Sequence, residues 1–584
     1  MTHADFLWLA TQKMNKNELI SKVKGLDALT LEEKSQLIDL INRKRYGLVW
    51  EDKPEEAEEL LNEALPVLSE VKERAIIYQP EKDESQAPNH ILIEGDNLHA
   101  LTSLCFTHEN KIDVIYIDPP YNTGNKDFRY YDSRYDEARD VDKENPFRHS
   151  MWLSFMSKRM KLAKRLLKDT GVVFISIDDN EQAQLKLLCD EIFGETNFIA
   201  ELVWKKKQGG GNDSTFFVIE HEYVFCYGKN KDYFKINLDA AHELSDALYP
   251  FKDEEGEYGL VTLDKSSIRY SDSLVFEIKD PDGNSYLPRN IKGKKSCWRW
   301  GKKKATEEYD KLVFKNGKVY TKYYRPLGVV PKSILYETRF GRTESGKDAI
   351  NEVLGNTLFS YPKPVELIKH IIGVSSQKES IILDFFAGSG TTLHSTMILN
   401  EEDAGKRQCI LVTNNENKIC EEVTYLRNKK VIEGYTKPNE EKVEGLLRNN
   451  FRYYKTAFVS REKTLKNKRE LTEFATELLS IKENCYTEIK GGKQIKIFQE
   501  KGIAVVIIYD DIHIPAAIEL IKKMSHELTI KVYVFAEGQD PYTEDFYEVG
   551  ERVQLCALPD AIYKAFQNIL PKKRKIRNEV TEEV

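Results

Sequence analysis

The sequence predicts an α/β chain in which one largely parallel sheet is interrupted by an inserted α+β module. Three observations predict this fold. Short apolar strands alternate with helical stretches after residue 88, the pattern dissolves into glycines, aromatic residues and lysines from Lys205, and it returns near Pro364. Strands that alternate with helices are typical of a parallel sheet. We expect a helical N-terminal arm before the sheet and a small α/β domain after it.

Length and composition favour a multidomain globular protein. The 584 residues suffice for roughly three to five domains. Hydrophobic residues make up 41% and charged residues 31%, which excludes a disordered chain. The sequence contains no apolar run long enough for a membrane span and no signal pattern, and its eight cysteines are scattered without metal-ligand spacing. We therefore expect a cytoplasmic protein that contacts no membrane and needs no metal.

The elements follow from apolar periodicity. Spacings of three and four residues predict helices over 14–75. Further helices are expected over 151–167, 364–372, 515–526 and from Thr391. The expected strands are 91–93, 114–117, 172–177, 381–385, 409–413, 503–509, 528–535 and 552–556. The expected units are the helical arm 1–88, the first half of the sheet 89–204, the inserted module 205–345, the second half 346–435, and a linker with the C-terminal α/β domain 436–584.

Charge is concentrated in the inserted module. The whole chain carries a net charge of -8, but residues 291–342 hold 15 lysines and arginines against four acidic residues. Aromatic residues such as Trp298, Trp300 and Tyr323 are interleaved with these charges. The mixture suits phosphate contacts combined with base stacking. A solvated basic face is the alternative interpretation.

The first chemical motif follows the strand expected at 114–117. Asp118, Pro119, Pro120 and Tyr121 come directly after its carboxyl end, where parallel sheets bind ligands. A carboxylate and backbone carbonyls can converge on one exocyclic amino group, while prolines contribute no competing N–H. Tyr121 adds an aromatic face on which an extruded base could stack. The alternative is a strand that ends in an ordinary turn.

The second motif joins the strand expected at 381–385 to a helix through a glycine turn, Phe386–Ala387–Gly388–Ser389–Gly390. Backbone N–H groups and the helix N-terminus would then face a carboxylate or phosphate. The spacing is GxG rather than GxGxxG, so the dinucleotide fingerprint is not met. Taken alone, this motif also fits a structural turn.

Together the two motifs resemble the amino-methyltransferases of DNA, which use S-adenosylmethionine and carry a DPPY-type catalytic motif and an FxGxG-type cofactor motif. Phe386, Gly388 and Gly390 supply the second motif. The order, with Asp118 first, looks like the circularly permuted β group, in which a target-recognition domain lies between the motifs. The resemblance covers about residues 89–435 and implies a permuted Rossmann-like, S-adenosylmethionine-dependent methyltransferase core.

Further segments narrow the resemblance. Residues 93–98 look like the strand-end element in which an acid, here Asp96, receives the adenine amine of the cofactor. Residues 204–211, 338–347 and 411–420, with the long C-terminal block, are similar to the Mod subunits of type III restriction-modification systems. That bacterial family methylates N6 of adenine in a short asymmetric DNA site. The resemblance implies a homodimer that associates with a separate Res helicase-nuclease subunit.

The resemblance also implies roles for single residues. Catalytic roles fall to Asp118, Pro119, Pro120 and Tyr121. Cofactor contacts are expected from Asp96, Asn97, Lys363, Asp384, Phe386, Gly388, Ser389, Gly390 and Thr391. Val412 is followed by Thr413, Asn414, Asn415 and Glu416 where the family usually has a ribose-binding acid, and we assign Asn415. The residues expected to contact DNA are Lys205, Lys206, Lys207, Trp298, Arg299, Lys302, Lys303, Lys304, Arg325, Arg339 and Arg342.

The chemistry requires an extruded base. The lone pair of the adenine amine is delocalised into the ring, and its N–H groups are paired within a duplex, so the base must leave the stack at a cost of about a few kcal/mol. Asp118 and the Pro119 carbonyl would accept the amine hydrogens and point the lone pair at the sulfonium methyl. The protein then supplies mainly alignment and a dry pocket.

Several alternatives stay open. Methylation of the cytosine amine uses the same geometry, although that family more often has serine in place of Asp118. A methyltransferase without a restriction partner, a non-catalytic specificity subunit and an RNA target also fit. Methylation of cytosine carbon 5 is disfavoured, because it needs a thiolate that usually follows proline and the chain has no Pro-Cys pair.

Other patterns are interpreted as structural. Residues 341–348 nearly spell a phosphate-binding loop, but Asp348 replaces the required hydroxyl residue. The pairs Asp178–Asp179 and Asp510–Asp511 suit turns or caps, and the basic segment 571–577 a solvated tail. His221 and Glu222 are interpreted as the start of a strand, with a contact role as the alternative.

Overall fold

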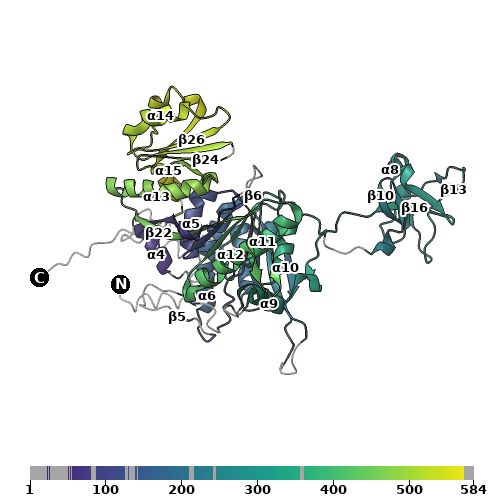
Figure 1. Cartoon of the computed structure of the whole chain (residues 1–584). Helices are drawn as coiled ribbons and strands as arrows, with labels where there is room; N and C mark the ends of the chain where they lie inside the picture. Colours follow the sequence, from purple (N-terminus) through teal and green to yellow (C-terminus); the bar gives the residue numbers. More distant parts are fainter. Residues whose placement is uncertain are drawn as a thin grey trace.

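A ten-stranded sheet forms the centre of the protein in the computed structural model (Figure 1). Its strands, from one edge to the other, are β1 (Ala64–Glu70), β22 (Asn450–Ser460), β2 (Asn89–Glu94), β19 (Gln408–Thr413), β18 (Ile381–Asp384), β3 (Ile112–Ile117), β6 (Leu167–Ile177), β8 (His221–Gly228), β7 (Phe198–Lys205) and β17 (Ile334–Leu335). The structure describes residues 23, 25, 30, 34, 50, 53, 55–79, 87–124, 129–130, 139–140, 143–209, 216–240, 245–355, 359, 361–500, 502–567 and 569–570.

The strands before and after the insertion belong to one sheet. Six neighbours, from β22 to β6, run parallel, while β1 and β8 pair antiparallel with the outer two of them. β18 follows the insertion in sequence, yet it lies between β19 and β3 and pairs with both. The predicted α/β fold with an interrupted parallel sheet is therefore confirmed.

Helices cover both faces of the central strands. Ile115 and Ile117 of β3 pack with one layer of helices, and the alternate residues Val114 and Tyr116 pack with the other. Strands buried on both faces need continuous apolar sequence, which explains the apolar runs recognised above. The first layer contains α5 (Asn97–His108), α6 (Arg148–Leu166) and α7 (Gln182–Phe193). The second contains α9 (Thr343–Leu354), α10 (Val365–Ser375), α11 (Thr391–Asp403), the π-helix η8 (Ile419–Tyr425) and α12 (Leu426–Glu433).

The helical arm predicted over residues 14–75 is wrong in its last part. Helix α4 (Glu56–Glu63) is present, but Ala64–Glu70 form the edge strand β1, which pairs with β22 from Ala64 opposite Ser460 onward. Pro66 disfavours a helix interior because it has no backbone N–H. Leu68 is fully buried in the sheet core instead. Most of the arm before residue 55 lies outside the described residues.

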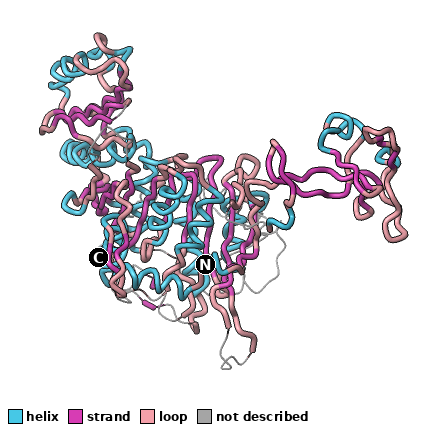
Figure 2. The backbone as a smooth tube through the Cα atoms, turned by 45° about the vertical axis from the view of Figure 1, so that its right-hand side comes forward, coloured by secondary structure: helices cyan, strands magenta, loops and turns pink. Residues whose placement is uncertain are grey.

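The separate lobe is smaller than the module predicted over 205–345, because β8 and β17 belong to the large sheet. Figures 1 and 2 show the lobe apart from that sheet, joined to it by two chain segments. Backbone hydrogen bonds between Asp239 and Val329 tie these segments together. The lobe contains β9 (Phe251–Asp253), β10 (Gly256–Thr262), β11 (Asp264–Lys265), β12 (Ile278–Lys279), β13 (Ser285–Tyr286), β14 (Cys297–Trp298), α8 (Lys302–Glu307), β15 (Leu312–Lys315) and β16 (Lys318–Tyr324).

A second sheet of five strands forms the C-terminal α/β domain, on the opposite side of the molecule from the lobe (Figures 1 and 2). The region predicted as linker and C-terminal domain, 436–584, also contributes β22 to the large sheet. Leu478 of α13 (Leu465–Glu483) and Ile562 of α15 (Asp560–Gln567) join the core around α5. The remaining elements of the domain are β23 (Glu488–Lys490), β24 (Ile495–Glu500), β25 (Ile503–Ile508), α14 (Ile514–Lys522), β26 (Thr529–Phe535) and β27 (Val553–Leu558).

Two further short hairpins are present in the described part of the chain. They pair β4 (Arg129–Tyr130) with β5 (Arg139–Asp140) and β20 (Tyr435–Thr436) with β21 (Lys442–Val443). None of the helices in the described part of the chain combines the length and apolarity that a bilayer crossing requires.

Candidate functional site

The predicted motifs meet at one edge of the large sheet. Strands β2, β3, β18 and β19 run parallel, so their carboxyl ends lie side by side. A cavity of about 890 Å³ lies there, and its lining includes Asp96, Asp118, Phe386 and Thr413, each of which follows or ends one of these strands. The sheet topology thus brings four distant parts of the sequence to one site.

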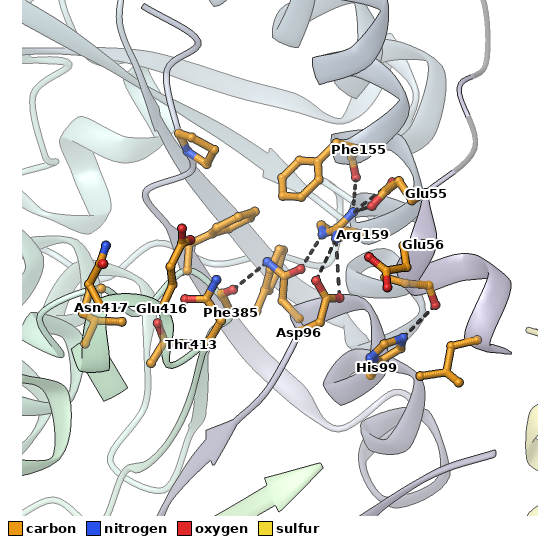
Figure 3. A pocket seen from close by; sticks show the side chains of 18 of the residues that line it. Glu55, Glu56, Asp96, His99, Phe155, Arg159, Phe385, Thr413, Glu416 and Asn417 are labelled. Atoms are coloured by element: carbon orange, nitrogen blue, oxygen red, sulfur yellow. Dashed lines mark hydrogen bonds and ion pairs between the residues drawn. The ribbon is translucent and has the colours of Figure 1, made fainter. Parts of the chain in front are cut away.

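One wall of the cavity is built around a buried arginine, Arg159 of α6 (Figure 3). Its guanidinium pairs with Glu55 at 2.9 Å and with Asp96 at 3.4 Å, and it donates to the side-chain oxygen of Asn97. Asn97 in turn donates to the carbonyl of Phe385 at 3.1 Å. Asp96 and Asn97 therefore line the cavity, and Arg159 and Glu55, which fix this wall, carry no local sequence signal.

The opposite wall follows β19. Thr413, Asn414 and Glu416 line the cavity there, and Figure 3 shows Glu416 across from Asp96. Asn415 does not line it, because its side-chain oxygen accepts the backbone N–H of Glu421 at 3.2 Å. Of the four residues considered for the ribose contact, Thr413, Asn414 and Glu416 thus line the cavity and Asn415 does not.

The glycine turn presents only part of its residues to the cavity. Phe386 and Gly388 line it, and Gly388 and Gly390 adopt left-handed φ angles of +48° and +74°. Asp384 lies behind the turn, where it accepts the N–H of Phe386 at 3.0 Å and the hydroxyl of Thr392 at 2.5 Å. Burial raises the pKa of Asp384 to about 7.

A second buried arginine supports the turn from behind. Arg427 of α12 is fully buried and donates to the Ser389 hydroxyl at 3.1 Å and to the Thr391 hydroxyl at 2.8 Å. Asp384, Ser389, Gly390 and Thr391 were predicted to contact the cofactor, but they do not line the cavity. Their contacts shape the loop that does.

A cluster of charged side chains surrounds Asp118. The Lys363 ammonium lies 2.8 Å from both Asp118 carboxylate oxygens and 2.8 Å from the Tyr121 hydroxyl. Glu222 of β8 lies 3.2 Å from that hydroxyl and 3.4 Å from the ammonium, and it also accepts from Lys206 at 3.1 Å. Two carboxylates and a lysine thus surround the Tyr121 hydroxyl, and a second lysine lies behind Glu222.

Opposite charges in this cluster shift the pKa of their neighbours toward the ionised form. Burial lowers the pKa of Lys363, but the negative charges of Asp118 and Glu222 outweigh burial, so the pKa is raised overall. Burial raises the pKa of Glu222, yet the nearby Lys363 and Lys206 outweigh it and the pKa is lowered. Burial together with the Asp118 and Glu222 carboxylates raises the pKa of Tyr121 far above its usual value. Lys363 and Glu222 are therefore ionised and the phenol of Tyr121 is neutral.

Two sequence interpretations change at this cluster. The Lys363 side chain was predicted to contact the cofactor, but its ammonium reaches the catalytic motif, while its carbonyl accepts the Thr391 hydroxyl at 3.3 Å. Glu222 does begin strand β8, as interpreted, yet it also joins the site. Pro120 lines the cavity, and its carbonyl is occupied by the indole N–H of Trp152 at 2.7 Å. Pro119 is buried.

The residues predicted to contact DNA divide into two groups. Lys207, Arg299 and the three lysines of α8, Lys302–Lys304, are exposed. Lys205 pairs with Glu220 at 3.6 Å, and Lys206 points toward Glu222. The lysines of α8 are exposed, although Lys303 and Lys304 lie 3.8 and 3.7 Å from Glu307 and Glu308 on the next turn.

The other four predicted DNA contacts are engaged within the protein. Trp298 belongs to the apolar core of the lobe, and its indole N–H donates to the Phe276 carbonyl at 2.7 Å, so it cannot stack on a base. Arg325 pairs with Asp246 and Glu257, and Arg339 with Asp239 and Glu337. The guanidinium of Arg342 donates to backbone carbonyls, including that of Gly341 at 2.8 Å. These side chains hold the lobe and its connections together.

The remaining motifs stay structural where the structure describes them. Asp178 and Asp510 accept backbone N–H groups two residues ahead, as turn and cap residues do. The near phosphate-binding loop is the start of α9, and residues 571–577 lie outside the described residues. The described residues contain no group of three or more His, Cys, Asp or Glu side chains that could hold a metal.

Comparison with known proteins decides the family. Residues 112–424, slightly more than half of the chain, match the DNA methylase family N6_N4_Mtase. The chain belongs to this family. The matched segment includes Asp118, Glu222, Lys363 and the glycine turn, so every member of the charged cluster lies within it.

The relatives of the chain include Mod subunits. The EcoPI Mod subunit of a type III restriction-modification enzyme from Escherichia phage P1 is 35% identical over 58% of this chain and 59% of its own length. The StyLTI Mod subunit from Salmonella typhimurium is 34% identical over 56% of this chain and 53% of its own length. The type II methyltransferase M.KpnI from Klebsiella pneumoniae is 35% identical over 55% of this chain and 79% of its own length. The resemblance to Mod subunits is confirmed, and the chain spans little more than half the length of the EcoPI and StyLTI Mod subunits.

The glycine turn gives a test with a matched control. Gly390→Ala places a methyl group against the Asn428 amide and 3.1 Å from Thr424 Cγ2, whereas Gly355→Ala, at nearly the same φ of +77°, meets no described atom within 4 Å. We expect Gly355→Ala to lower the free energy of unfolding by about 1 kcal/mol, from backbone strain alone. Gly390→Ala should lower it by about 1–3 kcal/mol more. Urea unfolding measures both, and equal losses would contradict the close packing of the turn.

Proposed function

We propose that the chain is a site-specific DNA methyltransferase that transfers a methyl group from S-adenosylmethionine to N6 of a flipped adenine in a short asymmetric site. It acts as the modification and recognition subunit of a type III restriction-modification system. One observation carries the proposal: Asp118 of the catalytic motif and Gly388 of the glycine turn line the same cavity. A donor bound on the turn would therefore share one cavity with the carboxylate that is proposed to accept the amine hydrogens.

The chemistry of the cavity fits a cationic cofactor. Acidic residues in its lining outnumber the basic ones, of which Arg159 is itself paired with Glu55 and Asp96. S-adenosylmethionine supplies an electrophilic methyl group on a sulfonium cation, which carboxylates attract. Asp96 would accept the adenine amine of the cofactor, Glu416 the ribose hydroxyls, and the backbone at Gly388 would face its carboxylate. No step of this scheme uses a metal ion.

The residues around Asp118 would orient the target amine. The carboxylate accepts one or both amine hydrogens, which keeps the nitrogen lone pair available and directed along the transfer path. The Tyr121 hydroxyl is tied to Asp118 at 2.8 Å, so its ring is fixed beside the carboxylate and offers a face for the flipped base. The proton can leave after methyl transfer, because the product nitrogen is then strongly acidic. Asp118 therefore acts mainly by position.

The lobe would recognise duplex DNA. Lys302, Lys303 and Lys304 form one exposed turn of α8, and Arg299 is exposed just before it. Exposed lysines and arginines bind phosphates without sequence preference, so they position a duplex while other groups read its bases. The two chain segments that join the lobe to the large sheet would let it sit over DNA whose target base enters at Asp118.

Partners separate the main candidate from a second one. Like other Mod subunits, the chain is proposed to dimerise and to associate with a Res helicase-nuclease subunit in the bacterial cytoplasm. The second candidate is a methyltransferase that needs no restriction partner. It is favoured by the similarity to the type II methyltransferase M.KpnI, since the match covers 79% of the length of that protein. Co-purification of a Res subunit with the tagged chain from its native host separates the two.

Removal of the catalytic carboxylate tests the proposed reaction. We expect Asp118→Ala to reduce methyl transfer to adenine-containing duplex DNA by at least about 100-fold, because the target amine loses its acceptor. DNA affinity should change less than about twofold, since the basic surface lies on the lobe. Asp510→Ala, at a strand-end aspartate of the C-terminal sheet, is the control and should retain full activity. Unchanged turnover in Asp118→Ala would contradict the proposal.

Charge reversal on α8 tests the DNA surface. Changing Lys302, Lys303 and Lys304 together to Glu should weaken binding and reduce the slope of log affinity against log salt by about 1 to 3, at roughly 0.9 per lost phosphate contact. The control is Lys490→Glu with Lys493→Glu, at exposed positions of the C-terminal sheet. Fluorescence anisotropy over a salt series measures both. An unchanged slope in the triple variant would place the DNA surface elsewhere.

A further inference from the structure

Lys363 occupies the atoms that the target amine needs. Its ammonium donates to both carboxylate oxygens of Asp118 at 2.8 Å, and these oxygens are the proposed acceptors for the adenine amine. The Lys363 ammonium therefore occupies the position in which the amino nitrogen of the target adenine would donate to Asp118. Before an amine can be held by Asp118, Lys363 must give up at least one of these hydrogen bonds.

Lys363 needs another anion when it leaves Asp118. Only 11% of its side chain is exposed, so water cannot replace the lost carboxylate without opening the site. Glu222 supplies that anion: one of its carboxylate oxygens lies 3.4 Å from the ammonium, and its side chain is 12% exposed. The ammonium thus already lies between two carboxylates, and a small rotation of its terminal bonds moves it from one to the other.

Lys206 and Tyr121 hold Glu222 ready for this role. Lys206 binds one oxygen of Glu222 at 3.1 Å, and the Tyr121 hydroxyl lies 3.2 Å from the other, the same oxygen that faces Lys363. These contacts come from the residue that directly follows β7 and from the catalytic motif, whereas Lys363 precedes α10. Glu222 is therefore fixed by two independent elements at the point where the lysine would arrive.

We propose that Glu222 is a positioning residue that takes over the Lys363 ammonium from Asp118 when the target amine enters the site. In the empty enzyme Lys363 neutralises Asp118. When the base is bound, Lys363 rests on Glu222, and Asp118 is released to accept the amine hydrogens. Two carboxylates and two lysines balance in charge in both arrangements, so a neutral adenine enters without any exchange of protons. This inference rests on the proposed function.

A purely structural role for Glu222 accounts less well for the arrangement. Buried ion pairs contribute little net stability compared with apolar side chains of similar size. Here two lysines and two carboxylates are gathered at the open end of the sheet and around the catalytic tyrosine, rather than in the core. The placement is explained if the charges serve an event at Asp118.

A double-mutant cycle tests the exchange. Glu222→Gln keeps the size and hydrogen-bonding capacity of the side chain and removes its charge. We expect it to lower the single-turnover rate of methyl transfer at least tenfold, with cofactor and DNA affinity unchanged within twofold, because Lys363 stays on Asp118. When Lys363 is replaced by Met, the same Glu222→Gln change should alter the rate by less than twofold, since no ammonium remains to be moved. Lys363→Gln is a second background if the Met variant does not fold.

Glu70→Gln is the matched control. Glu70 of β1 is buried to the same extent as Glu222, with 11% exposure, and pairs with Arg452 at 2.8 Å on the far edge of the sheet. Its loss should affect thermal unfolding and leave the transfer rate unchanged. Glu70→Gln therefore shows the effect of removing a buried carboxylate that lies away from the site.

Each other result counts against the exchange. Equal rate losses from Glu222→Gln with Lys363 present and absent would mean that Glu222 acts independently of the lysine. No rate loss in Glu222→Gln would mean that Lys363 needs no second anion. Absence of methyl transfer by the unmodified chain, in the presence of cofactor and target DNA, would overturn the proposed function itself, whereas the other two results leave that function standing.

Discussion

The site depends on the position of β18 in the sheet. This strand follows the inserted lobe in sequence, yet it pairs with β3, which precedes the lobe. That pairing sets the glycine turn beside Asp118 and brings Lys363, 245 residues away, to within 2.8 Å of the carboxylate. A cavity between parallel strand ends follows from the same arrangement. The lobe can therefore be large and separate without disturbing the chemistry.

Charge is handled differently on the two sides of the cavity. Around Asp118, lysines and carboxylates alternate, which leaves hydrogen bonds that can be exchanged. Around the glycine turn, Arg427 and Asp384 are fully enclosed and bonded to hydroxyl and backbone groups, which fixes the shape of the loop. The rigid glycine turn suits a methyl donor that binds in one pose. The exchangeable hydrogen bonds around Asp118 suit a target base that rotates out of the DNA helix into the site.

Local patterns predicted the two motifs and the interrupted sheet, because buried strands and glycine turns leave continuous signals in a sequence. Arg159 and Glu55 were missed as site residues, and Glu222 was given a contact role only as an alternative, since their roles arise from contacts with residues far away in sequence. Trp298 was misjudged because the face of a two-residue strand that points inward cannot be read from a basic, aromatic stretch. Strand β1 was taken for a helix because it follows α4 directly and is defined by its pairing with β22.

The most direct measurement of the central claim is a map of modified bases. The chain is expressed alone in a host that lacks adenine methylation, and the host DNA is sequenced with modification-sensitive reads. The account predicts N6-methyladenine at one short asymmetric motif, and none in a host that carries an empty vector. Unmodified adenine in the presence of the folded, cofactor-binding chain would contradict the claim that this chain alone recognises and methylates its site.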